Sequence, residues 1–286
     1  MLKFLKIAKS TYFYIIKTFN KVDGNKDIKD KIKQIFEKNN SNYGYRRITW
    51  ELKNKGYQIN HKKVKRLMKI LGLFGKQPRA KYKSFRGEIG KTCDNLLLTK
   101  GIDEENNKTY YVRNFKTTSV NQIWSTDVSE FHIAAGKLYL SPIIDAHNRE
   151  IVSYTISRSP NFKQVNDMLD IALNKYENLN GLILHSDQGW QYQMKQYRDK
   201  LLRNGIRQSM SRKGNCYDNC IIEIFFGTMK NEMFYGHEYD FKTLEQLEKA
   251  MHEYIAYYNN KRIISKLKGL TPIMYRHQSY NQLIFN

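Results

Sequence analysis

From Ile123 onward, runs of strand-type residues give way to segments with helical periodicity, and this order limits the fold more than any other feature of the sequence. Three strands are predicted first, at 123–133, 137–144 and 150–156. Helices at 162–176, 192–202, 218–234 and 242–258 then alternate with strands at 182–185 and 207–210. This pattern predicts an α/β domain with a mixed five-stranded sheet and helices on its faces.

The first 75 residues have a different pattern, with short helices predicted at 27–39, 48–55 and 61–71. Asn60 could cap the third of these helices at its start, and Gly72 could end it. One face of this helix is apolar, and the rest of it carries five basic residues: Lys62, Lys63, Lys65, Arg66 and Lys69. Such a unit resembles a helix-turn-helix, whose last helix enters the major groove of DNA. A helical bundle with a solvated basic face is the alternative interpretation.

Positive charge is concentrated in the first part of the chain. The whole sequence has 49 Lys or Arg and 27 Asp or Glu, for a net charge of +22, and residues 1–120 hold 29 of the basic and 10 of the acidic residues. An excess of this size usually indicates a polyanionic partner, either nucleic acid or an anionic membrane. We find neither a long apolar run nor the features of a signal peptide, so the sequence favours a cytosolic protein that binds nucleic acid.

Residues 76–120 are predicted to be a basic extended linker, because they are poor in apolar periodicity. Basic residues such as Arg79 and Lys81 are interleaved there with Tyr82 and Phe85. An arm of this kind suits binding along phosphates, and a plain flexible linker is the alternative. The sequence is thus divided into a helix-turn-helix-like region at 1–75, this linker, and a core at 121–286.

Three isolated acidic residues stand in apolar surroundings within the predicted core. Asp127 falls inside the first predicted strand, Asp187 follows the strand at 182–185, and Glu223 lies in an apolar helix. A charge inside an apolar strand costs free energy unless it has a partner, and ligands collect at strand ends in α/β sheets. Each acid alone is more often structural: a turn former, a helix cap or, for Glu223, a partner of Lys230.

Taken together, three carboxylates suit a site for two Mg²⁺ ions, which prefer carboxylate oxygens and water as ligands. In phosphodiester cleavage, two ions about 3.5–4 Å apart serve both the attacking and the leaving oxygen. One carboxylate must bridge the ions and one more must hold each ion on its outer side. Three acids are therefore the minimal set.

The spacing and the sequence around these acids resemble a known group of proteins. Thirty-five residues separate Asp187 from Glu223, the hallmark Asp–Asp–x35–Glu spacing of retroviral integrases and insertion-sequence transposases. The segments WSTD at 124–127, HSDQG at 185–189, SMSRKGNCYDN at 209–219 and EIFFGTMKNE at 223–232 look like the second-reading-frame (OrfB) transposases of two-frame insertion sequences. YNNKR at 258–262 and LTP at 270–272 resemble the closing segment of that family. The likeness runs from about Tyr43 to Met274.

The resemblance implies a DDE transposase with a ribonuclease-H-like core that performs DNA strand cleavage and strand transfer in insertion-sequence transposition. Asp127, Asp187 and Glu223 are then the catalytic residues and the ligands of two Mg²⁺ ions, for which Mn²⁺ could substitute. Lys230, two helical turns after Glu223, is expected to contact DNA, with a structural salt bridge as its alternative.

Three further polar residues near these segments have less certain roles. His185 and Asn219 are expected to orient the metal ligands, and they could equally satisfy the backbone of turns. Asp145 follows the second predicted strand and is expected to be a turn residue more often than a ligand.

The resemblance also implies partners and leaves two functions open. Element ends and target DNA are the expected substrates, a homo-oligomer is expected on paired ends, and the bacterial cytoplasm near the nucleoid is the expected location. Two-frame elements usually make the active enzyme as a fusion with a first-frame product, whose DNA-binding segment we do not find here. The chain is therefore expected to be a catalytic transposase or, without that fusion, a DNA-binding regulator of transposition. A nuclease that shares the fold is disfavoured by the basic first 120 residues.

Overall fold

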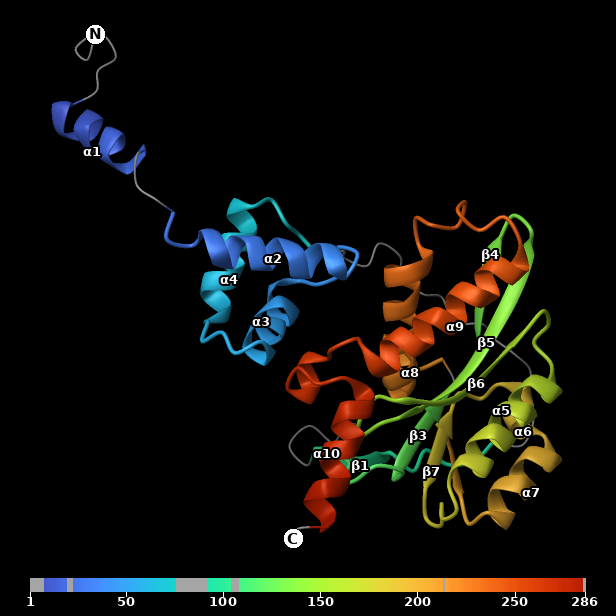
Figure 1. Cartoon of the computed structure of the whole chain (residues 1–286). Helices are drawn as coiled ribbons and strands as arrows, with labels where there is room; N and C mark the ends of the chain where they lie inside the picture. Colours follow the sequence, from blue (N-terminus) through green and yellow to red (C-terminus); the bar gives the residue numbers. More distant parts are fainter. Residues whose placement is uncertain (1–7, 20–22, 76–91, 104–107, 213, 285–286) are drawn as a thin grey trace. The chain divides into compact units, whose positions relative to one another are not determined.

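The computed structural model describes residues 8–19, 23–75, 92–103, 108–212 and 214–284 (Figure 1). The chain divides into two compact units, an N-terminal unit of residues 1–75 and a C-terminal unit of residues 76–286. The basic residues that we singled out between Arg79 and Phe85 lie outside the described residues.

Within its described residues, the N-terminal unit contains four helices, and three of them were predicted. Its helices are α1 (Lys9–Phe19), α2 (Lys26–Lys38), α3 (Tyr45–Asn54) and α4 (His61–Ile70). The predicted cap of α4 is confirmed, because the side chain of Asn60 accepts a hydrogen bond of 2.9 Å from the backbone N–H of Lys62. Ile32 of α2, Ile48 of α3 and Leu67 of α4 are almost fully buried, so the three predicted helices share a small apolar core. The apolar residues of α1 showed no pattern that we interpreted as a helix.

The described part of the C-terminal unit contains eight strands in two sheets, with helices between them. The strands are β1 (Leu98–Asp103), β2 (Lys108–Arg113), β3 (Ile123–Thr126), β4 (Ser129–Ile133), β5 (Gly136–Asp145), β6 (Ile151–Ser157), β7 (Ile183–Ser186) and β8 (Arg207–Met210). The helices are α5 (Phe162–Lys175), α6 (Trp190–Gln193), α7 (Lys195–Arg203), α8 (Cys220–Met229), α9 (Leu244–Asn260) and α10 (Pro272–Ile284), with 3-10 turns at Cys216–Asn219 and Ser265–Leu267 and a π-helical turn at Lys230–Phe234.

The large sheet is mixed, as predicted. β5 pairs antiparallel with β6 on one side and with β3 and β4 on the other, and β3, β7 and β8 are parallel to one another. One face carries α5, α6 and α7, and the other carries α8 and α9 (Figure 1). This is the ribonuclease-H-like arrangement that the resemblance implied, but the sheet has six strands rather than the predicted five, because the first predicted strand is divided into β3 and β4.

The first predicted strand, 123–133, is interrupted at Asp127, so our placement of Asp127 inside a strand was wrong. β3 and β4 follow one another along the same edge of β5 in an unchanged register, with Thr126 opposite Ile143 and Ser129 opposite Leu140. That register sets Pro142 opposite Asp127. Because proline has no backbone N–H, it cannot complete the ladder at this point. Asp127 is therefore the residue directly after β3.

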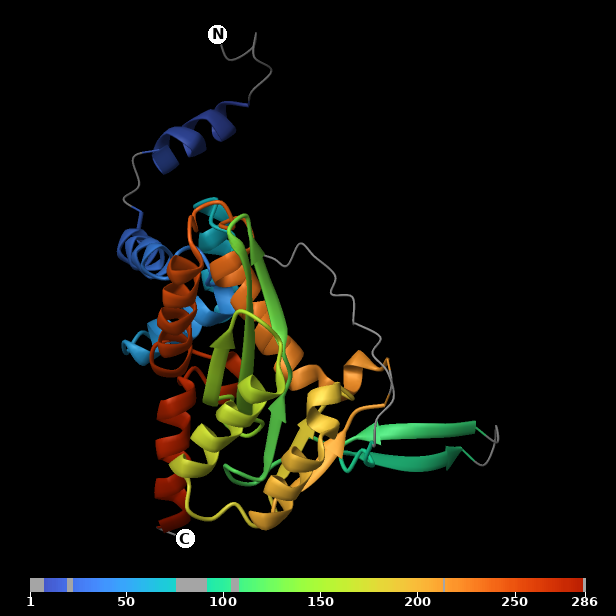
Figure 2. The same cartoon turned by 90° about the vertical axis from the view of Figure 1, so that its right-hand side faces the viewer.

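The predicted linker at 76–120 contains a two-stranded hairpin, which we did not expect in a segment without apolar periodicity. β1 and β2 pair antiparallel from Leu98–Arg113 to Asp103–Lys108. Figure 2 shows this hairpin extending away from the large sheet. Leu97, directly before it, is buried in the core between the sheet and α8, so the hairpin belongs to the C-terminal unit.

Two of the predicted helices are also divided. The segment 192–202 forms α6 and α7, because Met194 between them has an extended backbone. The segment 218–234 forms the end of a 3-10 turn, then α8, then a π-helical turn. Glu223 nevertheless stands in the first turn of α8, as the helical pattern indicated.

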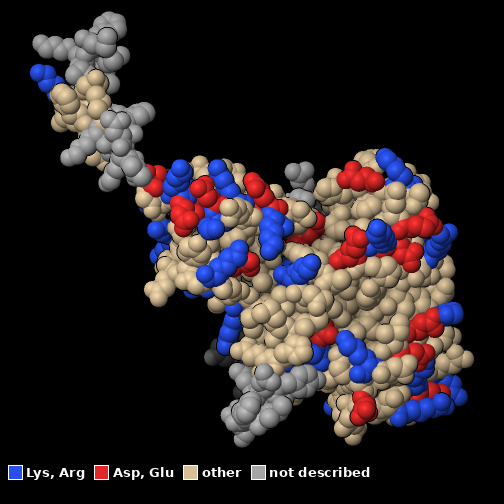
Figure 3. All heavy atoms as spheres, in the orientation of Figure 1, with Lys and Arg blue, Asp and Glu red and all other residues tan. Residues whose placement is uncertain are grey.

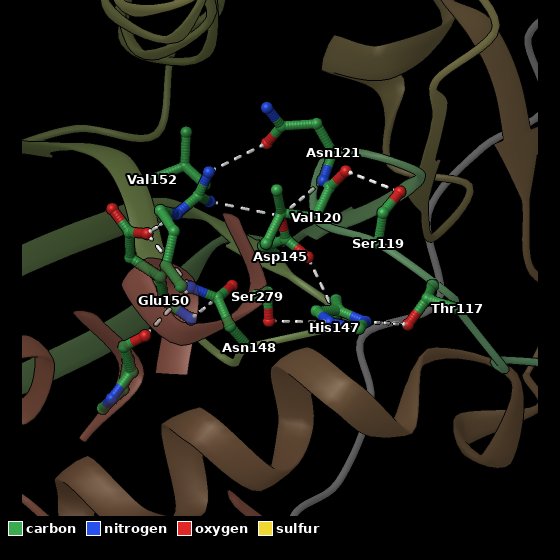
Figure 4. A network of polar contacts seen from close by, with 12 residues as sticks. Thr117, Ser119, Val120, Asn121, Asp145, His147, Asn148, Glu150, Val152 and Ser279 are labelled. Carbon is green, nitrogen blue, oxygen red and sulfur yellow. Dashed lines mark hydrogen bonds and ion pairs between the residues drawn. The ribbon is translucent and has the colours of Figure 1, made fainter. Parts of the chain in front are cut away.

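A buried network of charges joins α10 to the end of β5 and the start of β6 (Figure 4). The Arg276 guanidinium forms ion pairs with Asp145 and Glu150, and all three side chains are less than 10% exposed. Asp145 also accepts hydrogen bonds of 2.8 Å from the backbone N–H groups of Asn121 and His147. The carboxylates of Asp145 and Glu150 therefore both have ion-pair partners. Without such partners, burying a charge would cost a large free energy.

Charged side chains of both signs are interspersed on the face shown in Figure 3. Among the helices of the described segments, none is long and apolar enough to cross a membrane.

We predict that Arg276→Ala lowers the free energy of unfolding by about 3 kcal/mol, because it leaves two buried carboxylates without their cation. Chemical denaturation followed by circular dichroism measures this change. The matched control is Arg158→Ala, which breaks an ion pair with Glu245 whose side chains are 68% and 66% exposed. It should leave the free energy of unfolding nearly unchanged, because exposed ion pairs contribute little to stability. Equal effects of the two substitutions would contradict a supporting role for the buried network.

Candidate active site

Asp127 and Asp187 follow two neighbouring parallel strands. β3 and β7 pair in parallel with Ser125 opposite His185, and the same register carried two residues on sets Asp127 opposite Asp187. Paired strands lie about 4.8 Å apart. The two carboxylates therefore start from adjacent positions at the carboxyl edge of the sheet, where ligands of α/β folds collect.

Both acids lie on the sheet face that α8 covers. Side chains alternate between faces along a strand, and Trp124 and Thr126 contact the α5 side, where the Thr126 hydroxyl lies 3.6 Å from the Met168 sulfur. Asp127 therefore falls on the opposite face. By the same alternation, Leu184 belongs to the α5 side and Asp187 to the α8 side. On that side α8 buries Ile222, Phe225 and Phe226 against the sheet, which brings the partly buried Glu223 toward the two aspartates.

The three carboxylates repel one another. Burial, together with the negative charges of Asp187 and Glu223, raises the pKa of Asp127 well above its usual range. Burial also raises the pKa of Asp187, and burial and Asp187 together raise that of Glu223. The structure thus brings together the three acids that we selected from the sequence. Their arrangement favours the binding of cations.

The free oxygens of these acids match the preference of a hard cation. Oδ1 of Asp127 accepts a hydrogen bond of 2.7 Å from the backbone N–H of Val128, and Oδ1 of Asp187 accepts one of 2.9 Å from Gly189. Within the described part of the chain, no hydrogen bond reaches the second oxygen of either aspartate or the carboxylate of Glu223. In their present rotamers, no three metal-binding side chains of the described residues are close enough to chelate one ion. The available ligands are all carboxylate oxygens, and several of them have no hydrogen-bond partner among the described residues. Such a set of ligands fits Mg²⁺.

Lys230 lies at the edge of this cluster and is half-buried. Its ammonium group stacks 4.9 Å from the ring centroid of Phe131, and burial lowers the pKa of the lysine while the charges of Glu130 and Asp127 oppose that shift. The ion pairs found among the described residues do not include one between Lys230 and Glu223. A salt bridge between them, the structural alternative that we considered, is therefore not formed.

His185 and Asn219 are both buried, and neither is hydrogen-bonded to one of the three acids. Nδ1 of His185 lies 2.8 Å from the Ser209 hydroxyl, and burial lowers the histidine pKa to about 4, so the ring is neutral at pH 7. Nε2 of His185 and Oδ1 of Asn219 are buried without a hydrogen-bond partner among the described residues. Polar atoms of this kind are available to ordered water.

Asp145 does not belong to the cluster. It pairs with Trp124, three residues before Asp127, which places it about 10 Å further back along the sheet. Its carboxylate is held by Arg276 and two backbone N–H groups. The expectation that Asp145 is a structural residue agrees with this environment.

Asp218 is a buried acid near the site whose importance sequence reasoning missed. Its carboxylate, fully buried, accepts hydrogen bonds from Arg113 Nε at 2.8 Å and Arg212 Nε at 2.9 Å. These two arginines overcome the effect of burial and lower the pKa of Asp218 to about 2. Because Arg113 ends β2 and Asp218 precedes α8, the pair ties the hairpin to the helix that carries Glu223. Arg113 and Asp218 are 105 positions apart in the sequence, so no local sequence signal indicates this contact.

In the N-terminal unit, the basic residues expected to bind DNA are all exposed on α4. Lys62, Lys65, Arg66 and Lys69 have the i, i+3, i+4, i+7 spacing of one helical face. Lys63 lies beside this face rather than on it. Val64, Leu67 and Met68 are buried on the other side, as the apolar pattern predicted.

The chain matches two kinds of protein family. The integrase core domain matches residues 117–216 and, in a second family of the same description, residues 223–280. The HTH-like domain matches residues 24–81.

Curated relatives agree with these families over most of the chain. InsK of insertion sequence element IS150 from Escherichia coli (strain K12), named a transposase, is 46% identical, with 98% of this chain and 93% of that protein covered. A transposase-like protein of Haemophilus influenzae is 52% identical over 78% of this chain and 96% of its own length. The transposase for insertion sequence element IS904 of Lactococcus lactis is 35% identical, over 86% of this chain and 91% of that protein.

These matches run through the HTH-like region, the sheet that positions the acids and the helix that carries Glu223. The chain belongs to the insertion-sequence transposase family and is a DNA transposase with an integrase-type catalytic core.

Proposed function

We propose that Asp127, Asp187 and Glu223 hold two Mg²⁺ ions and are the catalytic residues of this transposase, with Mn²⁺ as a substitute. The observation that carries the proposal is the convergence of three partly buried carboxylates, on two strand ends and one helix, whose burial and mutual repulsion raise the pKa of Asp127. Bound there, the ions would activate the attacking hydroxyl group and stabilise the leaving oxygen of the phosphodiester.

The chain's own residues position the DNA and keep the acids in place. Hydrogen bonds from Val128 and Gly189 each fix one oxygen of an aspartate and leave the other free for a ligand. Lys230 lies close enough to Asp127 for the charge of the aspartate to raise the pKa of the lysine. The Lys230 ammonium group is therefore suited to contact a phosphate beside the acids. The neutral His185 ring and the Asn219 side chain support the acids through ordered water rather than by direct contact.

The substrates proposed for this chemistry are the element ends and the target DNA, held by a homo-oligomer. The exposed basic face of α4 supports binding of DNA by the N-terminal unit. A second candidate function is regulation, in which this chain occupies DNA and cleaves only when fused to a first-frame product. The intact set of three acids favours catalysis by this chain.

We predict that Asp127→Asn, Asp187→Asn and Glu223→Gln each reduce DNA cleavage about 100-fold or more. Loss of a residue that merely supports a metal ligand already costs roughly 10–100-fold, and these substitutions remove a ligand charge directly. The assay incubates the purified chain with a supercoiled donor plasmid that carries the element ends, in Mg²⁺ and then in EDTA.

Asp170→Asn is the matched control, because Asp170 lies on α5, on the other face of the sheet, and pairs with Lys200. It should leave cleavage unchanged. Cleavage in EDTA, or full activity in one of the three variants, would rule out the mechanism. An inactive wild-type chain beside an active fusion would support the regulatory function instead.

We also predict that replacing Lys62, Lys65, Arg66 and Lys69 together by alanine weakens DNA binding and reduces its salt dependence. Each lost phosphate contact lowers the slope of log K against log salt by about 0.9. Fluorescence anisotropy of labelled DNA between low and moderate salt measures the slope. The control replaces four lysines of α2: Lys26, Lys31, Lys33 and Lys38. Equal losses in both variants would show that the α4 face is only a solvated surface.

A further inference from the structure

The hairpin of β1 and β2 has two different faces, and adjacent tyrosines mark them. Tyr110 pairs with Gly101 and lies directly on it, so close that a Cβ atom at position 101 would collide with the tyrosine ring. Tyr111 pairs with Lys100 and points to the other face. The two rings are similarly exposed, at 52% and 44%. The Tyr110 ring thus packs over the glycine of its own hairpin. The Tyr111 ring lies on the opposite face.

Tyr111 lies in a group of alternating arginine and tyrosine side chains. The Arg212 guanidinium lies 4.3 Å from the centroid of the Tyr111 ring, and the Arg113 guanidinium lies 5.5 Å from that of Tyr217. We name these four residues the Arg–Tyr platform. Two of them come from β2 and two from the loop between β8 and α8, so distant parts of the sequence build one surface.

Asp218 beneath the platform holds both arginines rigidly. It accepts bonds from Nε of Arg113 and from Nε and one terminal nitrogen of Arg212, at 2.8–3.1 Å. One buried carboxylate under two guanidinium groups leaves the platform with an excess positive charge. Both arginine side chains remain 33% exposed, and Tyr217 is 70% exposed. Rings and guanidinium groups are therefore ordered and open to solvent.

The platform lies beside the candidate catalytic acids. Ser211, the residue before Arg212, donates its backbone N–H to the carbonyl of Ser186, the residue before Asp187, at 2.9 Å. The side chain of Gln188 also donates to the Ser211 carbonyl, at 3.0 Å. On the other side, Asp218 stands five residues before Glu223. The peptide that carries the platform is thus joined directly to both elements that carry Asp187 and Glu223.

We propose that the Arg–Tyr platform binds an unpaired stretch of DNA next to the catalytic acids. Exposed aromatic rings stack on unpaired bases, and ordered arginines hold the phosphates between them. A paired duplex keeps its interior bases stacked on one another and offers a base face to Tyr111 or Tyr217 only at its ends. The inference rests on the proposed function, and adds to it that DNA strands near the acids are held in part by base stacking.

The test measures binding of the full chain to two labelled DNAs, a blunt duplex and the same duplex with a single-stranded 3′ tail, by fluorescence anisotropy in EDTA. Tyr111→Ala and Tyr217→Ala are each expected to weaken binding of the tailed DNA about 10-fold and to leave binding of the blunt duplex unchanged. Tyr111→Phe keeps the ring and should restore wild-type affinity. Thermal unfolding of each variant checks that the fold is retained.

Tyr110→Ala is the matched control, because it removes an equally exposed ring from the other face of the same hairpin. It should change the affinity for tailed DNA less than about 2-fold. Equal losses for Tyr110→Ala and Tyr111→Ala, or equal losses on tailed and blunt DNA, would overturn the platform proposal. Neither of those results would contradict the proposed metal-dependent cleavage. Conversely, cleavage that persists in EDTA would overturn the proposed function without altering the binding comparison.

Discussion

Parallel pairing of β3 with β7 is the constraint on which the active site depends. Two buried strands that lie side by side, with Ser125 opposite His185, place the residues after them at adjacent positions. The apolar face of α8 then packs on the same side of the sheet and adds Glu223. None of these contacts involves the acids themselves. The packing of neutral residues holds the carboxylates close together, and its favourable free energy offsets their electrostatic repulsion.

Two groups of buried acids in this protein show what separates a structural carboxylate from a catalytic candidate. Asp145 and Glu150 share Arg276, and hydrogen bonds occupy both carboxylates. Asp127 and Asp187 each receive one backbone hydrogen bond, and the charges that act most strongly on Asp127 are those of Asp187 and Glu223. Burial alone therefore does not distinguish the groups, whereas the number of partners does. A residue's partners come from the tertiary structure, which explains why Asp145 was hard to classify from sequence.

Sequence reasoning succeeded where the information is local. The cap at Asn60, the buried face of α4, and the strand end before Asp187 are set by residues within one or two turns, and all were predicted. It failed where a partner lies far along the chain. The break at Asp127 comes from Pro142 on the neighbouring strand, and the anchoring of Asp218 comes from Arg113, over one hundred residues earlier. We did not predict the hairpin, because its strands are mostly exposed and show no alternation of apolar and polar residues.

The assembly of the acids from distant segments has a consequence for the newly made chain. β3, β7 and α8 are separated by about sixty and then about thirty-five residues of sequence, so their contacts can form only when long stretches of chain have closed into loops. The carboxylate cluster is complete only after α8 has been synthesised and packed. A partly folded or truncated chain therefore has an incomplete set of acids, and the capacity to cleave DNA arises together with the finished fold.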